Sequence, residues 1–380
     1  MLPEFPLTEL YVPFKNTQKT AVLDQEFYLC RKCGLGQLKN LVSGELLYSD
    51  GYVTRTSTSS SATAAIHQFT EFIDEILPDG KLDAIFDIGC NDNYLIKQFA
   101  QRSHNLFGND PIIDSRVEDY KESQLTLIGD FFENIDFDTL GVNIDCFLCS
   151  HTLEHIVDPA SFLSKALDAG NENTLYFFQF PGLEGMIRDA HFDQIFHQHF
   201  NYFSLKSIQY LLSKLGGELI DYRVNAYHWN SLMIAFRKTQ TPAVNQIFFS
   251  DTCKTILNKP FILRQYELFK QSMKITSNRL KSLNNERILG YGAALMLPVL
   301  DYHLEDGLSN VEAIIDEDLS KVGKYYLNVP IQIISTKMAG RLEDSIVLLT
   351  AINSTDASRK IIPKLIDLKF RQIIIPLNLI

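Results

Sequence analysis

The chain has 380 residues, of which 46% are hydrophobic and 21% charged, a composition typical of a folded globular protein. The formal net charge is −11 and no block of Lys or Arg is present, which argues against a nucleic-acid partner, because phosphate binding needs a basic surface. No apolar run reaches membrane-spanning length, so no membrane partner is predicted. A chain of this length is expected to form two or three domains.

The N-terminal stretch MLPEFPLTEL lacks the basic and apolar regions of a secretory signal peptide. The six cysteines are sparse for this length and fit a reducing compartment without a disulfide framework. We therefore expect a cytoplasmic protein.

Residues 1–65 are predicted to form a small N-terminal module, in which Cys30 and Cys33 have Cys-x-x-Cys spacing. Such a pair supplies half of a tetrahedral zinc site. Residues 1–29 contain neither Cys nor His, so either zinc binding is lost or residues are missing upstream. We favour loss, and zinc is therefore an improbable cofactor.

Residues 66–240 are predicted to form an α/β domain around an open, mostly parallel sheet. Apolar strand-like runs alternate with helical segments roughly every 20–30 residues, which is typical of repeated βαβ units. A Ser/Thr-rich link at 54–65 precedes the first helix, which is expected at 65–77.

The stretch FDIGCNDN indicates a strand, an acidic residue, a glycine and a polar turn into a helix. The crevice at such a turn binds nucleotide-like ligands in doubly wound sheets. A Gly-x-Gly-x-x-Gly is absent, so the pattern favours S-adenosylmethionine over a dinucleotide with its pyrophosphate. The alternative is a structural α/β domain in which Asp87 only caps the next helix. The predicted cofactor-binding residues of the turn are Asp87, Gly89, Asn91 and Asp92.

Three further residues at the ends of predicted strands complete the candidate cofactor site. Asp110 can accept both ribose hydroxyls, and Asp130 can contact an adenine amine. His151 follows the probable fourth strand, where the methionine end of the cofactor would lie. Glu154 and His155 are equally compatible with an outward helix face.

The rest of the chain forms two predicted parts. Residues 241–284 read as a helical connector. Residues 285–380 resume the strand–helix alternation and are predicted to form a second, smaller Rossmann-like domain.

Six stretches, in order and with similar spacing, resemble the sugar C-methyltransferases of deoxysugar biosynthesis over nearly the whole chain. They are CRKCGLGQL, DIGCNDNYLI, HIVDPASFL, FDQIFHQHFNYFS, GYGAALM and DEDLSKVGKYYLNVPIQI. The resemblance implies a zinc-binding module, a class I methyltransferase domain that uses S-adenosylmethionine, and a C-terminal domain that helps to bind a nucleotide-linked 4-keto-6-deoxysugar. It also implies a base that forms an enolate beside the ketone.

The central segment of this family usually reads Tyr-His-Glu-His, and here the matching residues are Phe196, His197, Gln198 and His199. Composition alone favours aromatic packing for the two histidines. The resemblance instead favours His199 as general base, because it is the only residue at the matching catalytic positions that can take a proton near neutral pH. His197 is a weaker catalytic candidate, and Gln198 can only donate or accept a hydrogen bond. No metal site is predicted here.

The resemblance also implies substrate-binding residues in both α/β units. Gln179 stands where the family often has Glu, and Trp229 and Asn230 replace the glycines of a His-Gly-Gly-Ser segment. The predicted substrate-binding residues are Gln179, His228, Asn230, Gly290, Tyr291, Gly292 and Asp316.

Three functions follow from these features. The first is a C-methyltransferase that acts on a nucleotide-linked keto-deoxysugar. The second is a methyltransferase with an oxygen or nitrogen acceptor, which needs less help from a base than carbon does. The third is a non-catalytic homologue that binds the cofactor or a sugar nucleotide.

Overall fold

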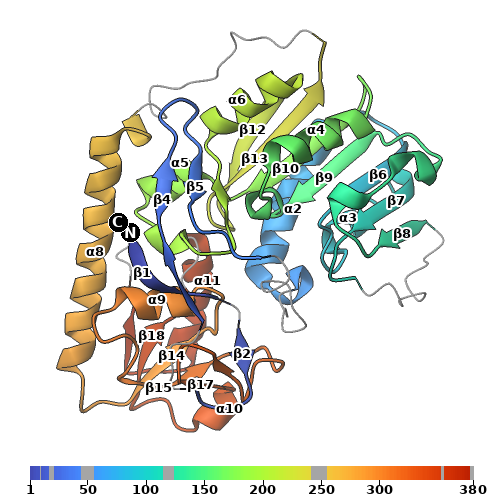
Figure 1. Cartoon of the computed structure of the whole chain (residues 1–380). Helices are drawn as coiled ribbons and strands as arrows, with labels where there is room; N and C mark the ends of the chain where they lie inside the picture. The colour runs from blue at the N-terminus through green and yellow to red at the C-terminus, as the bar shows by residue number, and fades with distance from the viewer. Residues whose placement is uncertain are drawn as a thin grey trace.

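The computed structural model describes residues 1–8, 10–16, 21–43, 55–113, 124–240, 255–351 and 355–376. Two seven-stranded sheets, one in each half of the chain, organise the fold (Figure 1). None of the helices in these described ranges has the length and apolar character that crossing a membrane requires.

The first sheet has the order β12-β13-β10-β9-β6-β7-β8. Its strands are β6 (Leu82–Ile88), β7 (Ser103–Asn109), β8 (Leu125–Ile128), β9 (Cys146–Ser150), β10 (Leu175–Phe180), β12 (Gly217–Asn225) and β13 (Ser231–Lys238). The five strands from β10 to β8 are parallel, and β13 pairs antiparallel with both β10 and β12. Strand order reverses between β6 and β9, and in such sheets this is where ligands bind.

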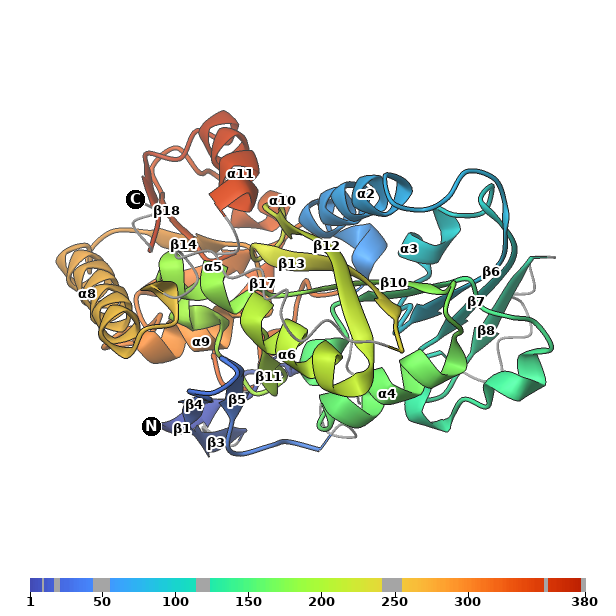
Figure 2. The same ribbon diagram turned by 90° about the horizontal axis from the view of Figure 1, so that it is seen from above.

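Helices cover both faces of this sheet, as Figure 2 shows. They are α2 (Ser60–Asp74) and α3 (Tyr94–Lys97) on one face, and α4 (Pro159–Ala169) and α6 (Leu205–Leu215) on the other. Alternation along β9 divides its side chains between the two hydrophobic clusters, with Phe147 and Cys149 in one and Cys146 and Leu148 in the other. This period of two is what a strand buried on both faces requires.

Helix α2 begins earlier than the Ser/Thr-rich link predicted. The Ser59 side chain accepts a hydrogen bond from the Ala62 backbone N–H, so residues 60–65 form the first turns of the helix. Serine is a favoured residue at this capping position. The predicted link is therefore wrong over 60–65, and the helix that borders the cofactor turn is longer than expected.

The second sheet has the order β19-β18-β14-β15-β17-β16-β2. Its strands are β14 (Ile288–Tyr291), β15 (Val311–Ile315), β16 (Tyr325–Tyr326), β17 (Gln332–Ile334), β18 (Ile346–Leu349), β19 (Gln372–Ile374) and β2 (Tyr11–Val12). The accompanying helices are α9 (Leu297–His303), α10 (Thr336–Ala339) and α11 (Thr355–Asp367). Helix α8 (Lys259–Ser282) runs along the side of the molecule in Figure 1; residues 241–254 of the predicted connector lie outside the described residues.

The N-terminal residues contribute strands to three sheets. Strand β1 (Leu2–Pro6) pairs with β3 (Val22–Gln25), and β2 joins the C-terminal sheet. Strands β4 (Phe27–Leu29) and β5 (Gly36–Leu38) form a third sheet with β11 (Asn201–Tyr202), directly after His199. The described part of this N-terminal region thus contacts both the C-terminal sheet and the loop that carries His197 and His199, here called the histidine loop.

Candidate active site

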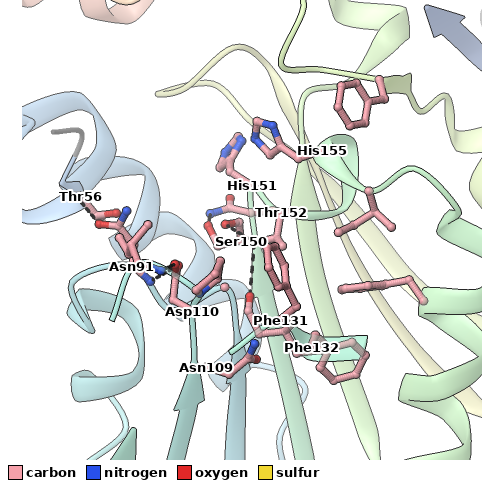
Figure 3. Close-up of a pocket in the computed structure, with 18 of the residues that line it drawn as sticks. Thr56, Asn91, Asn109, Asp110, Phe131, Phe132, Ser150, His151, Thr152 and His155 are labelled. Atoms are coloured by element: carbon pink, nitrogen blue, oxygen red, sulfur yellow. Dashed lines mark hydrogen bonds between the residues drawn. The ribbon is translucent and has the colours of Figure 1, made fainter. Parts of the chain in front are cut away.

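A cavity of about 880 Å³ opens at the carboxyl ends of β6, β7, β9 and β10, beside the start of α2 (Figure 3). Four of the predicted cofactor-binding residues line it: Gly89, Asn91, Asp110 and His151. The other three, Asp87, Asp92 and Asp130, are not part of its wall. The cavity occupies the crevice that the sequence pattern indicated.

Asp110 is the acidic side chain at the end of β7 that faces this cavity. Its Oδ2 accepts a hydrogen bond from the Asn91 N–H at 2.9 Å, and its Oδ1 accepts one from the Ile112 N–H at 3.0 Å. Burial raises the pKa of Asp110 above its usual range. Two backbone amides hold the carboxyl group in place and leave lone pairs for a ligand.

The turn after β6 is built around Gly89, whose φ is +70°. A Cβ added there would lie 2.2 Å from Thr152 Oγ1, so this position has no room for a side chain. Asp87, just before the turn, is buried, and neither of its carboxylate oxygens has a hydrogen-bond partner in the described part of the chain. Burial raises its pKa well above the usual range, with the Asp110 charge a further contribution.

Asp92 and Asp130 have structural contacts. Asp92 Oδ2 accepts a hydrogen bond from the Ser57 N–H at 2.9 Å and so fixes the turn before α2. Asp130 Oδ1 accepts hydrogen bonds from the Phe131 N–H and the Asn134 side chain, both at 2.7 Å. The carboxyl group of Asp130 thus forms hydrogen bonds within its own turn, and its contact with adenine stays a prediction.

Three histidines line the opposite part of the cavity: His151, His155 and His228. His151 Nδ1 lies 3.1 Å from Glu154 Oε1, and its Nε2 lies 3.1 Å from His228 Nδ1. His151 has a φ of +55°, in the left-handed region that few non-glycine residues adopt. The sequence indicated His151 as a cavity residue but did not reveal its two ring partners.

Glu154 is the functional candidate that the sequence pattern missed. The chain turns after β9 through a short 3₁₀ helix (Leu153–His155), which directs Glu154 inward, and its side chain is only 1% exposed. Burial raises its pKa to about 7. The outward helix face considered for Glu154 and His155 is therefore wrong for both: Glu154 is buried and His155 lines the cavity.

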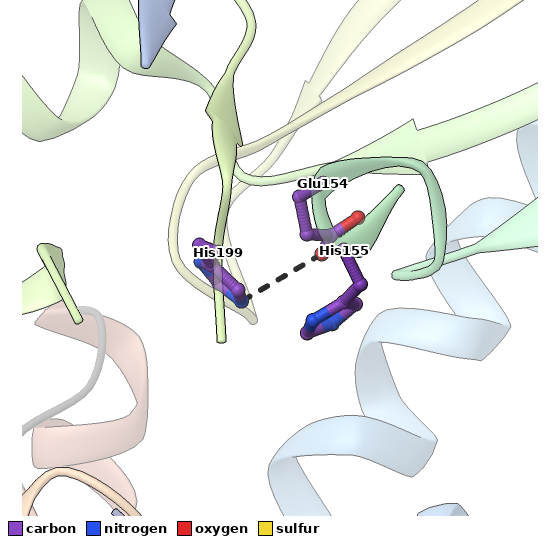
Figure 4. Close-up of side chains that lie close together, drawn as sticks. All are labelled: Glu154, His155 and His199. Carbon is purple, nitrogen blue, oxygen red and sulfur yellow. Dashed lines mark ion pairs between the residues drawn. The ribbon is translucent and has the colours of Figure 1, made fainter. Parts of the chain in front are cut away.

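His199 is not part of the cavity wall and lies beside Glu154 and His155 (Figure 4). Its Nε2 is 4.0 Å from Glu154 Oε1, and its ring centre is 4.9 Å from that of His155. The rings of Phe196 and Trp229 cover it at 4.2 and 5.2 Å. Burial lowers the pKa of His199 well below its usual range, and the neighbouring histidines add to this effect. Its predicted role as base stays a prediction.

His197 and Gln198 are not part of the cavity wall and make structural contacts. His197 Nδ1 accepts a hydrogen bond from Gln25 Nε2 at 2.9 Å, and its Nε2 donates to the Phe5 carbonyl at 3.2 Å. The backbone carbonyl of Gln198 lies 2.8 Å from His155 Nδ1. His197 thus connects the histidine loop to the N-terminal strands, and Gln198 positions His155 through its backbone.

Two clusters have residue types that bind metals. Glu154, His155 and His199 each offer a ligand atom within 4.8 Å of the others, and no other such group of three occurs in the described residues. Cys30 and Cys33 are free thiols, the former exposed and the latter partly buried. The sequence pattern had not indicated a third ligand beside His199, because Glu154 and His155 approach from a different loop.

The loop between β12 and β13 carries His228 and Asn230. Trp229 and Asn230 have φ values of +53° and +48°, so the backbone keeps a glycine-like conformation without glycine. The Trp229 ring stacks on His228 at 5.0 Å, and Asn230 Nδ2 donates to Asp189 Oδ2 at 2.7 Å. Gln179, also in the cavity wall, donates to Ser150 Oγ at 2.7 Å.

The remaining predicted substrate-binding residues lie in the C-terminal sheet and not in the cavity wall. A Cβ on Gly292, whose φ is +97°, would lie 2.2 Å from Ala351 Cβ. Asp316 accepts hydrogen bonds from the Ala293 and Asp318 N–H groups at 2.5 and 2.8 Å. Gly290 and Tyr291 form the end of β14. Close packing accounts for Gly292, and substrate binding by these four residues stays a prediction.

A parallel sheet with this order and one antiparallel strand, together with a cavity at its switch point, is the architecture of class I methyltransferases. A family model described as a methyltransferase domain matches residues 62–222. The chain is 25% identical over 220 residues to the C-methyltransferase NovU of Streptomyces niveus, a match that covers 54% of this chain and 49% of NovU. The chain therefore matches about half the length of this relative.

Solved structures are similar at lower identity. A 1,6-didemethyltoxoflavin-N1-methyltransferase of Burkholderia thailandensis is 11% identical, with a TM-score of 0.40, over 57% of this chain and 100% of that one. A magnesium protoporphyrin IX methyltransferase of Synechocystis PCC 6803 is 14% identical, with a TM-score of 0.35, over 51% of this chain and 89% of that one.

The chain contains a class I methyltransferase domain, and its methyl donor is S-adenosylmethionine. The cavity fits this cofactor chemically. The cavity-facing carboxyl group of Asp110 is an acceptor, whereas the cofactor has an ammonium group and ribose hydroxyls as donors. Gly89 also lines the cavity.

Proposed function

We propose that this protein is a C-methyltransferase that acts on a nucleotide-linked keto-deoxysugar. The observation that carries the proposal is the set of three histidines and a buried carboxyl group beside the cofactor cavity. A carbon next to a ketone becomes nucleophilic only after it loses a proton, so C-methylation needs a base in this place. The similarity to the C-methyltransferase NovU supports the same reaction.

In the proposed reaction, a histidine removes the proton from the carbon beside the ketone, and the electron pair of the C–H bond forms an enolate. The cofactor would supply an electrophilic methyl group, whose bond to sulfur would break as the enolate carbon bonds to it, with S-adenosylhomocysteine as the leaving group. The cavity walls keep the acceptor oriented and exclude water. His151, His155 and His228 suit the role of base better by position than His199 does, because all three line the cavity.

The charges around the cavity bear on how the substrate would enter. Arg55 is the only Lys or Arg among the described residues of the wall, which also contains the acids Asp110, Glu133 and Asp158. A diphosphate would meet little compensating charge inside. We infer that the sugar end enters the cavity while the nucleotide stays outside it, toward the C-terminal α/β unit. We also propose that the reaction takes place in the cytoplasm.

Two substitutions favour a second candidate, methyl transfer to oxygen or nitrogen. Phe196 and Gln198 occupy positions where the family that the chain resembles has Tyr and Glu. Acceptors other than carbon need less help from a base. Glu154 argues for the first candidate, because it supplies a buried carboxyl group in the same cluster.

Cofactor titration followed by a substrate screen tests the proposal. Calorimetry should detect binding of S-adenosylmethionine, which Asp110→Ala should weaken. Incubation with a panel of nucleotide-linked 4-keto-deoxysugars should give a product heavier by one methyl group. Cofactor binding without any methylated product would instead favour a non-catalytic homologue.

A further inference from the structure

Glu154, His151 and His228 form a continuous hydrogen-bonded chain that leads from the protein interior to the cavity. The distances are 3.1 Å from Glu154 Oε1 to His151 Nδ1 and 3.1 Å from His151 Nε2 to His228 Nδ1. Two separate segments supply them: the residues directly after β9, which carry His151 and Glu154, and the loop between β12 and β13, which carries His228. Glu154 lies at the buried end, and both histidines line the cavity.

The hydrogen bonds among these three side chains specify which ring nitrogen carries each proton. An ionised Glu154 can only accept, so Nδ1 of His151 must donate to it. A neutral His151 then has an unprotonated Nε2, which accepts from the Nδ1–H of His228. Ser231 Oγ also lies 3.2 Å from His151 Nε2. It donates its proton to the His228 carbonyl at 2.6 Å, so it does not compete with His228 as the donor to His151 Nε2. Nε2 of His228 is left as the basic nitrogen.

The fold maintains this arrangement at a cost. His151 and Trp229 both adopt positive φ values, +55° and +53°. Such conformations cost about 1–3 kcal/mol each and persist only where the surrounding structure imposes them. The Trp229 ring lies nearly parallel to that of His228, with an interplanar angle of 9°. The rings of His151 and His228 are in edge contact, with their centres 4.6 Å apart.

We propose that Glu154, His151 and His228 act as a proton relay in which His228 is the base and the other two are positioning residues. This inference rests on the proposed function. The C–H bond beside the ketone breaks and leaves its electron pair on the enolate, while His228 Nε2 gains the proton. His228 passes its Nδ1 proton to His151, and His151 passes its own to Glu154, which ends as a neutral carboxylic acid.

The buried end of the relay suits proton uptake. Burial raises the pKa of Glu154 to about 7, so near neutral pH its carboxylate accepts a proton readily. The other titratable groups beside it are Cys149, His155, His199 and Tyr202; burial raises the pKa of Cys149 and Tyr202 and lowers that of the two histidines. Burial of Glu154 outweighs the charge of His155, which by itself lowers the pKa of this carboxyl group.

Solvent exchange measures the first step without methyl transfer. The wild-type protein, saturated with S-adenosylhomocysteine, is incubated with a methylatable keto-sugar in deuterium oxide, and NMR follows exchange at the carbon beside the ketone. E154Q keeps the shape but cannot take up a proton, and H228N keeps an amide near the Nδ1 position but loses Nε2. We expect each to slow exchange about 100-fold or more, with S-adenosylhomocysteine affinity changed less than twofold.

E184Q is the matched control. Glu184 is another acid whose pKa burial raises to about 7; its Oε1 accepts from the Leu205 N–H, and it does not line the cavity. Exchange by E184Q should equal that of the wild type. If E154Q also matches the wild type, the relay is wrong.

A second measurement tests the relay independently of any substrate. Nitrogen-15 NMR of labelled histidines should show His151 protonated on Nδ1 and His228 protonated on Nδ1, with both Nε2 atoms unprotonated. The opposite tautomer of either residue would overturn the relay. If the wild type neither exchanges nor methylates any keto-sugar while these tautomers are observed, the proposed function fails and the hydrogen-bond order stands.

Discussion

At the scale of single residues, the side chains that matter most are those whose surroundings oppose their usual behaviour. Asp87 is buried with unpaired oxygens, Glu154 is buried beside neutral histidines, and His151 has a left-handed backbone. Each of these three features, taken by itself, destabilises the folded state. Such conflicts concentrate at functional sites, and here His151 lines the cavity, while Asp87 and Glu154 are buried next to loops that contribute to its wall.

Asp110 should determine cofactor affinity. Its carboxyl group faces the cavity and is oriented by two backbone amides, so Asp110→Asn should weaken S-adenosylmethionine binding about 10–100-fold, through the loss of charge-assisted hydrogen bonds to the ribose. Isothermal calorimetry measures this. Asp138→Asn, at an exposed position outside the cavity wall, is the control. Equal affinities for the two variants would show that the ribose binds elsewhere.

The proton-exchange rate should depend on pH through Glu154. Because burial raises its pKa to about 7, Glu154 is protonated below this pH and cannot receive a proton from His151. Burial lowers the pKa of His151 to about 4, and it also lowers the pKa values of His155, His199 and His228. We expect the rate to rise from pH 6 to 8 with an apparent pKa of about 7. A wild-type profile that is flat over this range would contradict the assignment.

At the scale of elements, the turn between β6 and α3 depends on Gly89. Gly89→Ala adds both a strained φ and a Cβ that would lie 2.2 Å from Thr152 Oγ1. Gly80, with a φ of +99°, has no atom within 4 Å of an added Cβ, so Gly80→Ala adds backbone strain alone. We expect Gly89→Ala to lower the free energy of unfolding by about 2 kcal/mol more than Gly80→Ala does. Urea denaturation checks this, and equal losses would mean that the turn relaxes.

The elements also show why part of the site was hidden in the sequence. The strand periodicity correctly predicts β6, β7, β9 and β10, and therefore the edge where Gly89, Asp110 and His151 meet. The inward direction of Glu154 follows from a short 3₁₀ turn after β9, and local pattern does not distinguish this from the first turn of an amphipathic helix. The positive φ of Trp229 is likewise set by packing against His228.

At the scale of the whole molecule, N-terminal strands attach to the histidine loop. Gln25 is fully buried, and its Nε2 donates to the Asn40 carbonyl and to His197 Nδ1. Gln25→Ala should lower the free energy of unfolding by about 2–4 kcal/mol, because it leaves buried partners unpaired. Its cofactor affinity should stay within twofold of the wild type.

Gln37→Ala is the comparison for this change, because Gln37 is exposed and makes one long hydrogen bond, 3.3 Å, to Asn201. It should cost less than about 1 kcal/mol. A large loss of cofactor affinity in Gln25→Ala would instead mean that His197 acts at the cavity, as the sequence allowed.

Long-range pairing explains what the sequence could not predict about the molecule. The alternation of strands and helices predicts two α/β units. It carries no information that Tyr11 and Val12 join the C-terminal sheet, more than 300 residues away. The motif that carries His199 is local, but the position of His199 beside His155 depends on how two distant loops pack.

The central claim is that the methyl group is transferred to carbon, and the NMR signal of the transferred methyl group tests this claim. The protein is supplied with S-adenosylmethionine labelled with carbon-13 in the methyl group and with a nucleotide-linked 4-keto-deoxysugar, and the product is examined by NMR. The account predicts a methyl signal with the chemical shift of a methyl bonded to carbon, correlated with the ring carbon beside the former ketone. A methyl shift characteristic of attachment to oxygen or nitrogen would contradict it.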